Sequence, residues 1–308
     1  MTDHSTALRP ARSTAPENER PRSAGTPAPR KSGPSRLVSI GKHALLIALS
    51  LVMLYPVLWM VVSSLRPEGH IFDNPGLVLD TFATKNYTTG WSALQRPFGV
   101  YLLNSAVIVL GAIIGNLVSC SLAAYAFARL SFRYKRIAFA AMLLTMMLPI
   151  QVLIIPQYVI YSQLGWINTF LPLIVPKFLA TDGFFVFLMV QFIRGIPREL
   201  DEAARIDGAG HARIFFQIIL PLMKPALATA AIFTFIWTWN DFFSQLVFVT
   251  EPDKYTASVA LRQFIDPTGQ SDFGALFAMS VVTLVPVFLA FLFGQRFLLR
   301  GIATTGGK

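Results

Sequence analysis

Side chains that could carry out covalent or metal chemistry are sparse in this sequence. The four histidines stand at positions 4, 43, 70 and 211, and no pair of them has the short spacing typical of metal ligands. No arrangement of Ser, His and Asp for nucleophilic catalysis can be argued either. The glycine-rich end fails as a phosphate-binding loop because Gly307 stands where that loop needs lysine. We therefore expect no catalytic residue, metal site or cofactor in this chain.

A second group of chemically capable residues lies inside long apolar stretches, where polar side chains are costly and by default face a cavity or a partner. They are amides, charged groups and indoles, which can hydrogen-bond to hydroxyl groups or stack on the face of a ring. The candidate pathway residues are Gln151, Gln157, Lys177, Asp182, Trp237, Trp239, Asn240 and Asp241. Contact with a neighbouring subunit would explain residues 237–241 as well, and Lys177 would also suit the membrane interface. These alternatives stay open.

A charged stretch between two apolar ones has the residue types of a docking element. Pro197 and the acidic residues after it are typical of a helix start, and Gly208 is typical of a helix end. The pattern predicts a helix of about three turns ending near Gly208, then a second helix from His211 to Leu220 that stops at Pro221. The candidate docking residues are Glu202, Ala203, Ala204, Asp207, Gly208, Ala209, Phe215, Phe216, Leu220 and Pro221.

The chemistry of this stretch suits contact with another protein. Alanine and glycine let a foreign backbone approach closely, and carboxylates pair with Arg or Lys of a partner. The two phenylalanines can anchor in a partner's cleft or back against the helix bundle. The alternative is an ordinary connector stabilised by its own pairs, such as Asp201 with Arg205. We favour docking because Glu202-Ala203-Ala204 is followed at fixed spacing by Gly208, Ile218 and Leu220-Pro221.

The elements that must position these residues are membrane helices. Of 308 residues, 54% are hydrophobic and only 14% are charged, which indicates a membrane protein. Six apolar stretches, each near or above the roughly 20 residues that cross a bilayer as helix, lie at 43–65, 102–128, 137–160, 170–193, 226–248 and 274–298. Prolines at 149, 156, 172 and 176 interrupt the third and fourth stretches, which neighbouring helices or a water-lined cavity can tolerate. We expect an all-α polytopic membrane protein with six transmembrane helices.

The distribution of basic residues predicts the orientation. Of the 26 Lys and Arg residues, 20 fall in the N-terminal tail, the second and fourth connections and the C-terminal end. The positive-inside rule therefore places both termini and the docking stretch in the cytoplasm. These flanks explain the net charge of +10, and no basic stripe with interleaved aromatics marks a soluble segment, so nucleic acid is excluded as a partner. The lone Cys120 excludes an intrachain disulfide.

The N-terminal tail, residues 1–36, is rich in Arg, Pro, Ser, Thr and Ala. It lacks the apolar side chains needed to offset chain entropy, so we expect it to be disordered and cytoplasmic. The apolar stretch that follows is too long for a cleavable signal peptide and ends without a small-residue cleavage pattern. The basic residues of the tail fix topology, and contact with anionic membrane lipid remains an alternative. Residues 37–308 are expected to form the membrane domain.

The stretch from Pro197 to Ala209, with Leu220-Pro221 and the run from Phe235 to Phe242, resembles the permeases of ATP-binding-cassette (ABC) importers. The resemblance is to the carbohydrate-uptake branch, in particular the maltose-permease-G-like subunits, and covers about residues 43–308. It implies a bacterial, multi-pass cell-membrane subunit with the type I ABC importer permease fold (MetI-like). In that family the stretch at about 196–222 is the cytoplasmic coupling loop.

The same resemblance implies partners. They are a homologous F-like permease subunit, a dimer of ABC ATPases that binds the ATP and Mg, and an extracytoplasmic, lipoprotein-like sugar-binding protein. The C-terminal Gly306-Gly307-Lys308 of such subunits reaches toward the ATPases. We expect alternating access, in which movement of the coupling loop is passed to the fourth and fifth spans.

Other functions remain to be weighed. A stand-alone secondary transporter or channel would need inverted repeats or a paired ionisable relay, and neither is evident; a scaffold without a path is disfavoured by the proline-broken polar spans. Within the family, the substrate could be a disaccharide, an oligosaccharide, a polyol, or glycerol 3-phosphate and its diesters.

Overall fold

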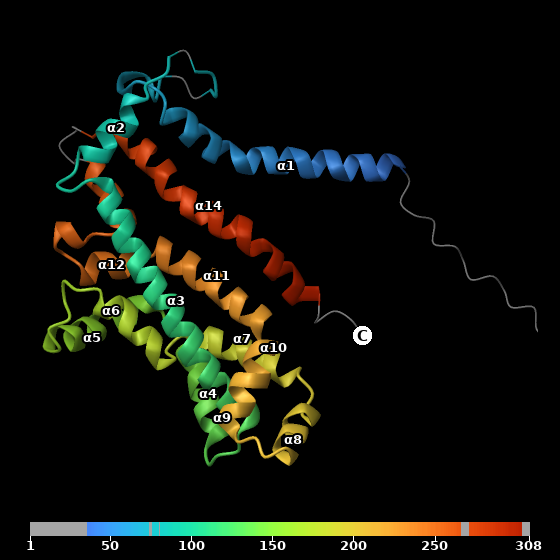
Figure 1. Cartoon of the computed structure of the whole chain (residues 1–308). Helices are drawn as coiled ribbons and strands as arrows, with labels where there is room; N and C mark the ends of the chain where they lie inside the picture. The colour runs from blue at the N-terminus through green and yellow to red at the C-terminus, as the bar shows by residue number, and fades with distance from the viewer. Residues whose placement is uncertain (1–35, 74–75, 80, 266–270, 304–308) are drawn as a thin grey trace, which may run out of the picture. The chain divides into compact units, whose positions relative to one another are not determined.

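The computed structural model describes residues 36–73, 76–79, 81–265 and 271–303, and every regular element within them is helical (Figure 1). The α-helices are α1 (Arg36–Ser63), α2 (Lys85–Ser92), α3 (Phe98–Arg129), α4 (Lys135–Thr145), α5 (Ile150–Gln163), α6 (Leu171–Ile174), α7 (Gly183–Arg194), α8 (Glu199–Ile206), α9 (His211–Ile214), α10 (Leu220–Leu222), α11 (Lys224–Asn240), α12 (Phe243–Phe248), α13 (Ala257–Leu261) and α14 (Phe273–Ala303). Tighter or wider helical turns are η1 (Glu68–His70), η2 (Val175–Leu179), η3 (Phe215–Ile219), η4 (Pro252–Lys254) and η5 (Arg262–Phe264).

The chain divides into two compact units, residues 1–53 and 54–308. Within the described residues the first unit consists of the beginning of α1, and the second contains all other elements and both candidate sites. Apart from Arg36, which begins α1, the tail predicted to be disordered lies outside the described residues. The same is true of Gly306-Gly307-Lys308.

Four described helical segments are long and apolar enough to cross a membrane: Val38–Ser63, Phe98–Arg129, Leu171–Arg194 and Phe273–Arg296. Two pairs of helices pass the same test together but are sharply bent between their members: α4 with α5, and His211–Leu222 with α11. Counting each bent pair as one span gives six, the number that the apolar stretches predict.

The third predicted span is not one helix. The axes of α4 and α5 differ by 103°, and the break lies at residues 146–149. Pro149 explains the position of the break, because a proline disfavours helical backbone at the residue before it. Pro156 lies inside α5 without ending it. The predicted span 137–160 is therefore a bent pair of helices.

The fourth and fifth predicted spans also break. The fourth passes through α6 and η2, then leaves helical geometry at Ala180, whose φ is 53°, before α7 begins. For the fifth span, predicted over 226–248, the predicted C-terminal end is wrong. Helix α11 stops at Asn240, and α12 is a separate helix. Asp241 separates them because its backbone is extended, and its carboxylate accepts a hydrogen bond of 3.1 Å from the Ser244 amide in the first turn of α12.

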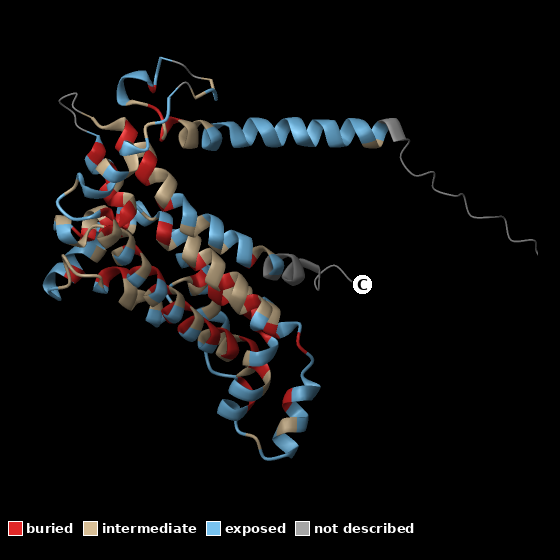
Figure 2. Cartoon of the chain, turned by 45° about the horizontal axis from the view of Figure 1, so that its top comes forward, coloured by how far each residue is buried: buried red, intermediate tan, exposed pale blue. Residues whose placement is uncertain are grey.

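Helix α3 is the central packing element of the second unit. In Figure 1 it runs from the end where α2 lies to the end where α8 and α9 lie, and it packs against α7, α11 and η2. Buried residues concentrate where these helices meet (Figure 2). Gly115 allows the closest approach: a Cβ there would lie 2.8 Å from the Phe178 ring and 3.0 Å from the Lys177 carbonyl carbon. Glycine thus brings η2 directly against the α3 backbone.

Candidate functional site

The first candidate site is the loop formed by residues 196–222. Its first helix, α8, ends in a left-handed turn at Gly208, where φ is 79°. The Gly208 amide donates to the Arg205 carbonyl at 3.0 Å, and the Ala209 amide donates to the Ala204 carbonyl at 2.9 Å. These two bonds form the usual glycine-terminated helix end. The helix therefore ends near Gly208 as predicted, although α8 has 8 residues instead of about three turns.

The second part of the loop differs from the single helix predicted over residues 211–220. The sequence forms α9, then a π-helical turn, η3, and then α10, which continues past Pro221 to Leu222. In the π turn the Leu220 amide donates to the Phe215 carbonyl, five residues earlier. Proline explains the altered register, because Pro221 has no amide hydrogen to donate to the carbonyl of Gln217.

The predicted docking residues divide by exposure. Exposed residues are Glu202, Ala203, Asp207, Gly208, Phe216 and Pro221; partly buried ones are Ala204, Ala209 and Leu220; Phe215 is buried. Phe215 packs on Tyr125 of α3 with 5.2 Å between ring centres, so it anchors the loop to the bundle. Ile206 was missed by the sequence interpretation, although it is 87% exposed. An apolar residue between Arg205 and Asp207 was the available signal.

Asp201 does not form the pair with Arg205 that the alternative of an ordinary connector would use. Its carboxylate oxygen Oδ2 lies 2.8 Å from Nε of Arg129, the last residue of α3, and the two side chains are 8% and 3% exposed. Arg129 also donates from Nη2 to the Ile196 carbonyl at 2.7 Å. The first half of the loop is thus held to α3 by a buried ion pair.

The second candidate site is a cavity of about 570 Å³ between α5, the break from α6 to α7, and the break from α11 to α12. It gathers seven of the eight predicted pathway residues: Gln151, Gln157, Lys177, Asp182, Trp237, Asn240 and Asp241. The eighth, Trp239, is buried elsewhere: its indole donates to the Thr283 carbonyl of α14 at 3.2 Å and stacks on Phe235. Trp239 therefore has a packing role.

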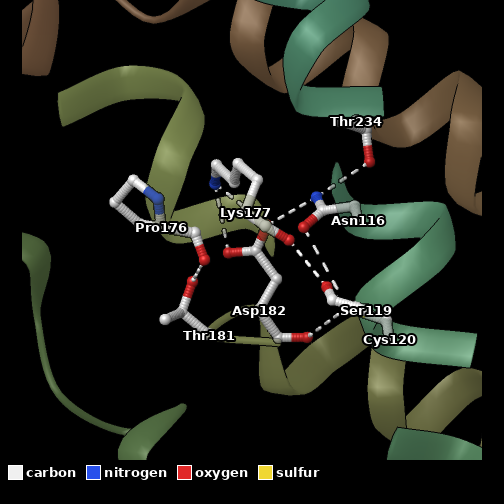
Figure 3. A network of polar contacts seen from close by, with 8 residues as sticks. All are labelled: Asn116, Ser119, Cys120, Pro176, Lys177, Thr181, Asp182 and Thr234. Atoms are coloured by element: carbon white, nitrogen blue, oxygen red, sulfur yellow. Dashed lines mark hydrogen bonds and ion pairs between the residues drawn. The ribbon is translucent and has the colours of Figure 1, made fainter. Parts of the chain in front are cut away.

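A polar network forms one wall of this cavity (Figure 3). Lys177 Nζ lies 2.9 Å from Oδ2 of Asp182, and Asn116 of α3 donates to the same oxygen at 2.6 Å. The Asn116 amide also reaches the Thr234 hydroxyl of α11 at 3.2 Å. Ser119 donates to the Lys177 carbonyl at 2.6 Å. The network joins α3, η2, the start of α7 and α11, and it satisfies polar groups that would be costly inside a membrane.

The lining of the cavity also includes an aromatic face and two amides without hydrogen bonds to other described residues. Trp237 is 48% exposed, and its ring centre lies 5.3 Å from that of Phe184 and 5.2 Å from that of Phe185. Among the described residues, no hydrogen bond ties the amides of Gln151 and Gln157 to the protein. A packed indole and uncommitted amides are the groups that bind hydroxylated rings.

The loops at the end of the molecule away from α8 are held by a further ion pair. Arg96 donates from Nε and Nη2 to the two carboxylate oxygens of Asp253, at 3.0 and 2.9 Å. The hydrogen bond from Arg96 lowers the pKa of Asp253 below its ordinary value, and the same bond raises the pKa of Arg96. Both side chains are about half exposed, so solvent screens the pair. No group of His, Cys, Asp and Glu within the described ranges could hold a metal ion.

Helices of membrane-spanning length, a polar cavity where those helices break and an exposed helical loop together define the membrane component of a transporter. Comparison with known proteins makes this specific. Residues 108–303 match the family described as binding-protein-dependent transport system inner membrane component, and the chain belongs to that family. It is thus a multi-pass inner-membrane permease subunit of a binding-protein-dependent ABC importer, a kind of subunit that lacks the nucleotide-binding domain.

Curated relatives agree in length and differ in substrate. The chain is 34% identical to the diacetylchitobiose uptake system permease protein NgcG of Streptomyces coelicolor, over 82% of this chain and 84% of the relative. It is 32% identical to the arabinooligosaccharides transport system permease protein AraQ of Halalkalibacterium halodurans, with 91% and 99% covered. It is 31% identical to the sn-glycerol-3-phosphate transport system permease protein UgpE of Yersinia pestis, with 84% and 94% covered.

A solved structure shows the same fold. One chain of a bacterial ABC transporter involved in the import of the acidic polysaccharide alginate matches with a TM-score of 0.74 at 22% identity, over 87% of this chain and 99% of that one. The predicted ABC importer permease fold is therefore confirmed. Membership of a binding-protein-dependent system sets aside the stand-alone transporter and the scaffold.

Proposed function

We propose that this chain conducts a sugar across the membrane and that the cavity beside Trp237 is part of its path. The observation that carries the proposal is the convergence of seven polar or aromatic residues, from three separately broken spans, on one cavity. An exposed indole stacks on the apolar face of a pyranose or furanose ring, and the amides of Gln151, Gln157 and Asn240 suit its hydroxyl groups.

The charges of the cavity wall favour an uncharged sugar over a phosphate. Lys177 is the only basic residue among the described residues that line the cavity. Asp182 already neutralises its charge, with 2.9 Å between Nζ and Oδ2. Asp241 adds a carboxylate that has no cationic partner among the described residues. A ligand that carries a phosphate or carboxylate would meet this negative charge at low dielectric, where repulsion is strong. A di- or oligosaccharide, or a related polyol, therefore fits better than glycerol 3-phosphate or its diesters.

The exposed 196–222 loop is proposed as the site where an ATPase dimer docks. Glu202 and Asp207 offer carboxylates to basic side chains, and Ala203 and Gly208 leave room for a close approach. The exposed apolar side chains of Ile206 and Phe216 provide the hydrophobic part of the same surface. In this proposal the ATPases bind the ATP and Mg.

The remaining partners complete the importer. They are a homologous F-like permease subunit beside this chain, membrane lipid around both, and a lipoprotein-like sugar-binding protein at the opposite membrane face. Lys and Arg are in excess near both termini of this chain and near the 196–222 loop. This excess supports a cytoplasmic location for the two termini and the loop.

The test is sugar uptake by proteoliposomes that contain the complete importer and its binding protein. Trp237→Ala should lower uptake about two- to tenfold, the amount expected from one lost aromatic stacking contact, without changing the amount of permease in the membrane. Trp91→Ala removes another half-exposed indole that does not line the cavity, so it serves as the control. Equal uptake by the wild type and Trp237→Ala would contradict the assignment of the cavity.

The substrate class is tested in the same vesicles. Diacetylchitobiose and arabinooligosaccharides represent uncharged sugars, and sn-glycerol 3-phosphate represents the charged alternative. We expect uptake of an uncharged sugar and none of the phosphate. Uptake of glycerol 3-phosphate would overturn the argument from the wall charges.

A further inference from the structure

The end of α3 holds the first half of the 196–222 loop through one enclosed charge pair. Arg129 and Asp201 lie 2.8 Å apart, and both side chains are less than one tenth exposed. Nε of Arg129 and Oδ1 of Asp201 make no hydrogen bond among the described residues, so the 2.8 Å contact joins the two groups as an ion pair, with Arg129 balancing the charge of this carboxylate. Separating the members of this buried pair is costly, because each would be left as an uncompensated charge in poorly solvated surroundings. The pair therefore fixes α8 against the end of α3.

The same end of α3 also holds the second half of the loop. Tyr125 lies one turn before Arg129, so the two side chains share a helix face. The Tyr125 ring packs on Phe215, and its hydroxyl lies 3.4 Å from Nδ1 of His211. Contacts from two successive turns of α3 therefore reach α8 on one side and α9 with η3 on the other.

Farther along, α3 contacts the cavity wall. Asn116 donates to Asp182 at 2.6 Å, and Ser119 donates to the Lys177 carbonyl at 2.6 Å. Asn116 and Arg129 belong to one continuous helix and are separated along it by about 20 Å, at 1.5 Å per residue. One rigid helix thus touches the loop at one end and the network of Figure 3 at its middle.

The helices that adjoin the loop in the sequence change direction or end where they meet it, although they share its buried core. The axes of the segment His211–Leu222 and of α11 differ by 73°, with the break at Met223. On the other side, Gly195 to Arg198 separate α7 from α8.

We propose that Arg129 and Asp201 form the joint through which movement of α8 is passed to α3 and from there to Lys177 and Asp182 at the cavity. They are positioning residues: neither touches a substrate, and both act through α3. The inference rests on the proposed function, because it presumes an ATPase docked on the loop. It adds a route through α3 to the expected passage of movement to the fourth and fifth spans.

The test uses the complete importer in proteoliposomes, in which ATP hydrolysis and sugar uptake are measured together. Asp201→Asn and Arg129→Gln each remove one charge and leave the exposed docking residues in place. We expect the ATPases still to copurify and hydrolysis to continue, while sugar transported per ATP falls about tenfold or more, within the range of coupling between distant sites. A residue needed only for folding would lower assembly and both activities together.

Arg133→Gln is the matched control. Arg133 lies four residues beyond Arg129, is exposed and rests over the ring of Tyr134. The same loss of positive charge at this position should leave sugar transported per ATP unchanged. The charge swap Arg129→Asp/Asp201→Arg should recover part of the lost coupling.

If a single variant fails to reach the membrane, the double variant Arg129→Gln/Asp201→Asn replaces it, because it leaves no unpaired buried charge. An assembled double variant with wild-type uptake per ATP would overturn the proposal. The wild-type complex separates this failure from that of the proposed function: if the wild type hydrolyses ATP without importing sugar, the proposed function fails before any variant is compared.

Discussion

Lys177 and Asp182 show how a charged pair is accommodated beside a membrane cavity. Their side chains are 28% and 25% exposed, so each charge is partly desolvated and depends on the other. Asn116 donates a further hydrogen bond to Asp182, which leaves the carboxylate well satisfied while both partners are present. Removing either member leaves the other charge unbalanced, which costs more than the pair itself contributes.

We predict that Lys177→Met or Asp182→Asn alone destabilises the purified permease by about 1–3 kcal/mol, the cost of an unsatisfied, partly buried polar group. The double variant should be less destabilised than the sum of the two, because it contains no unpaired charge. The measurement is a double-mutant cycle on the free energy of unfolding in detergent.

Glu251→Gln is the control for this cycle. Glu251 pairs with Lys254 at a site where the side chains are 52% and 42% exposed, so its replacement should change stability by less than about 1 kcal/mol. Strict additivity of the effects at Lys177 and Asp182 would contradict an energetic link between them.

Residue types identified the pathway candidates, although the sequence could not show which of them meet. Gln151, Lys177 and Asp241 stood out because polar groups inside apolar stretches are costly, and the structure gathers them around one cavity. Trp239 had the same signal, but its indole is satisfied by a carbonyl of α14. The partner of Asp201 was equally hidden: Arg129 is 72 positions away in the sequence, and local spacing favoured Arg205 instead.

At the scale of elements, two glycines that follow α8 allow the effect of backbone strain to be tested without a steric clash. An added Cβ at Gly208 or at Gly210 would meet no heavy atom within 4 Å. The two glycines differ in backbone: Gly208 is left-handed with φ 79°, whereas Gly210 is extended with φ −77° and ψ 170°. Alanine is strained at the first position and relaxed at the second.

We predict that Gly208→Ala weakens binding of the ATPase about 5- to 30-fold, the equivalent of roughly 1–2 kcal/mol of left-handed strain. Gly210→Ala should bind as the wild type does. The measurement is the dissociation constant of the ATPase for the detergent-solubilised permease. Equal affinity of the two variants would show that the turn at Gly208 does not shape the docking surface.

Apolar stretches predicted the existence of the spans better than their shape. Six stretches of sufficient length were evident because crossing a bilayer needs roughly 20 apolar residues. The 103° angle between α4 and α5, and the end of α11 at Asn240, depend on neighbours that satisfy the broken backbone. Pro149 marked one break correctly, whereas Pro156 lies within an intact helix, so proline alone does not predict where a span bends.

At the scale of the whole permease, the packing predicts which parts move as one body. Helix α3 is fixed to η2 and the start of α7 by Gly115, Ser119 and the hydrogen bond from Asn116 to Asp182. Cys120 lies in this seam, is fully buried and is the only cysteine of the chain. If α3 and α7 travel together during transport, Cys120 stays covered in every state.

We therefore predict that a membrane-permeant maleimide modifies Cys120 slowly, and at the same rate, in the nucleotide-free importer and in the importer trapped with ATP. A cysteine introduced by Trp237→Cys lies on the cavity wall, and its rate should change between these states as the cavity opens to one side or the other. The measurement is labelling followed by mass spectrometry. Faster labelling of Cys120 with ATP would mean that the seam between α3 and α7 opens, and α3 would then not carry the cavity wall with it.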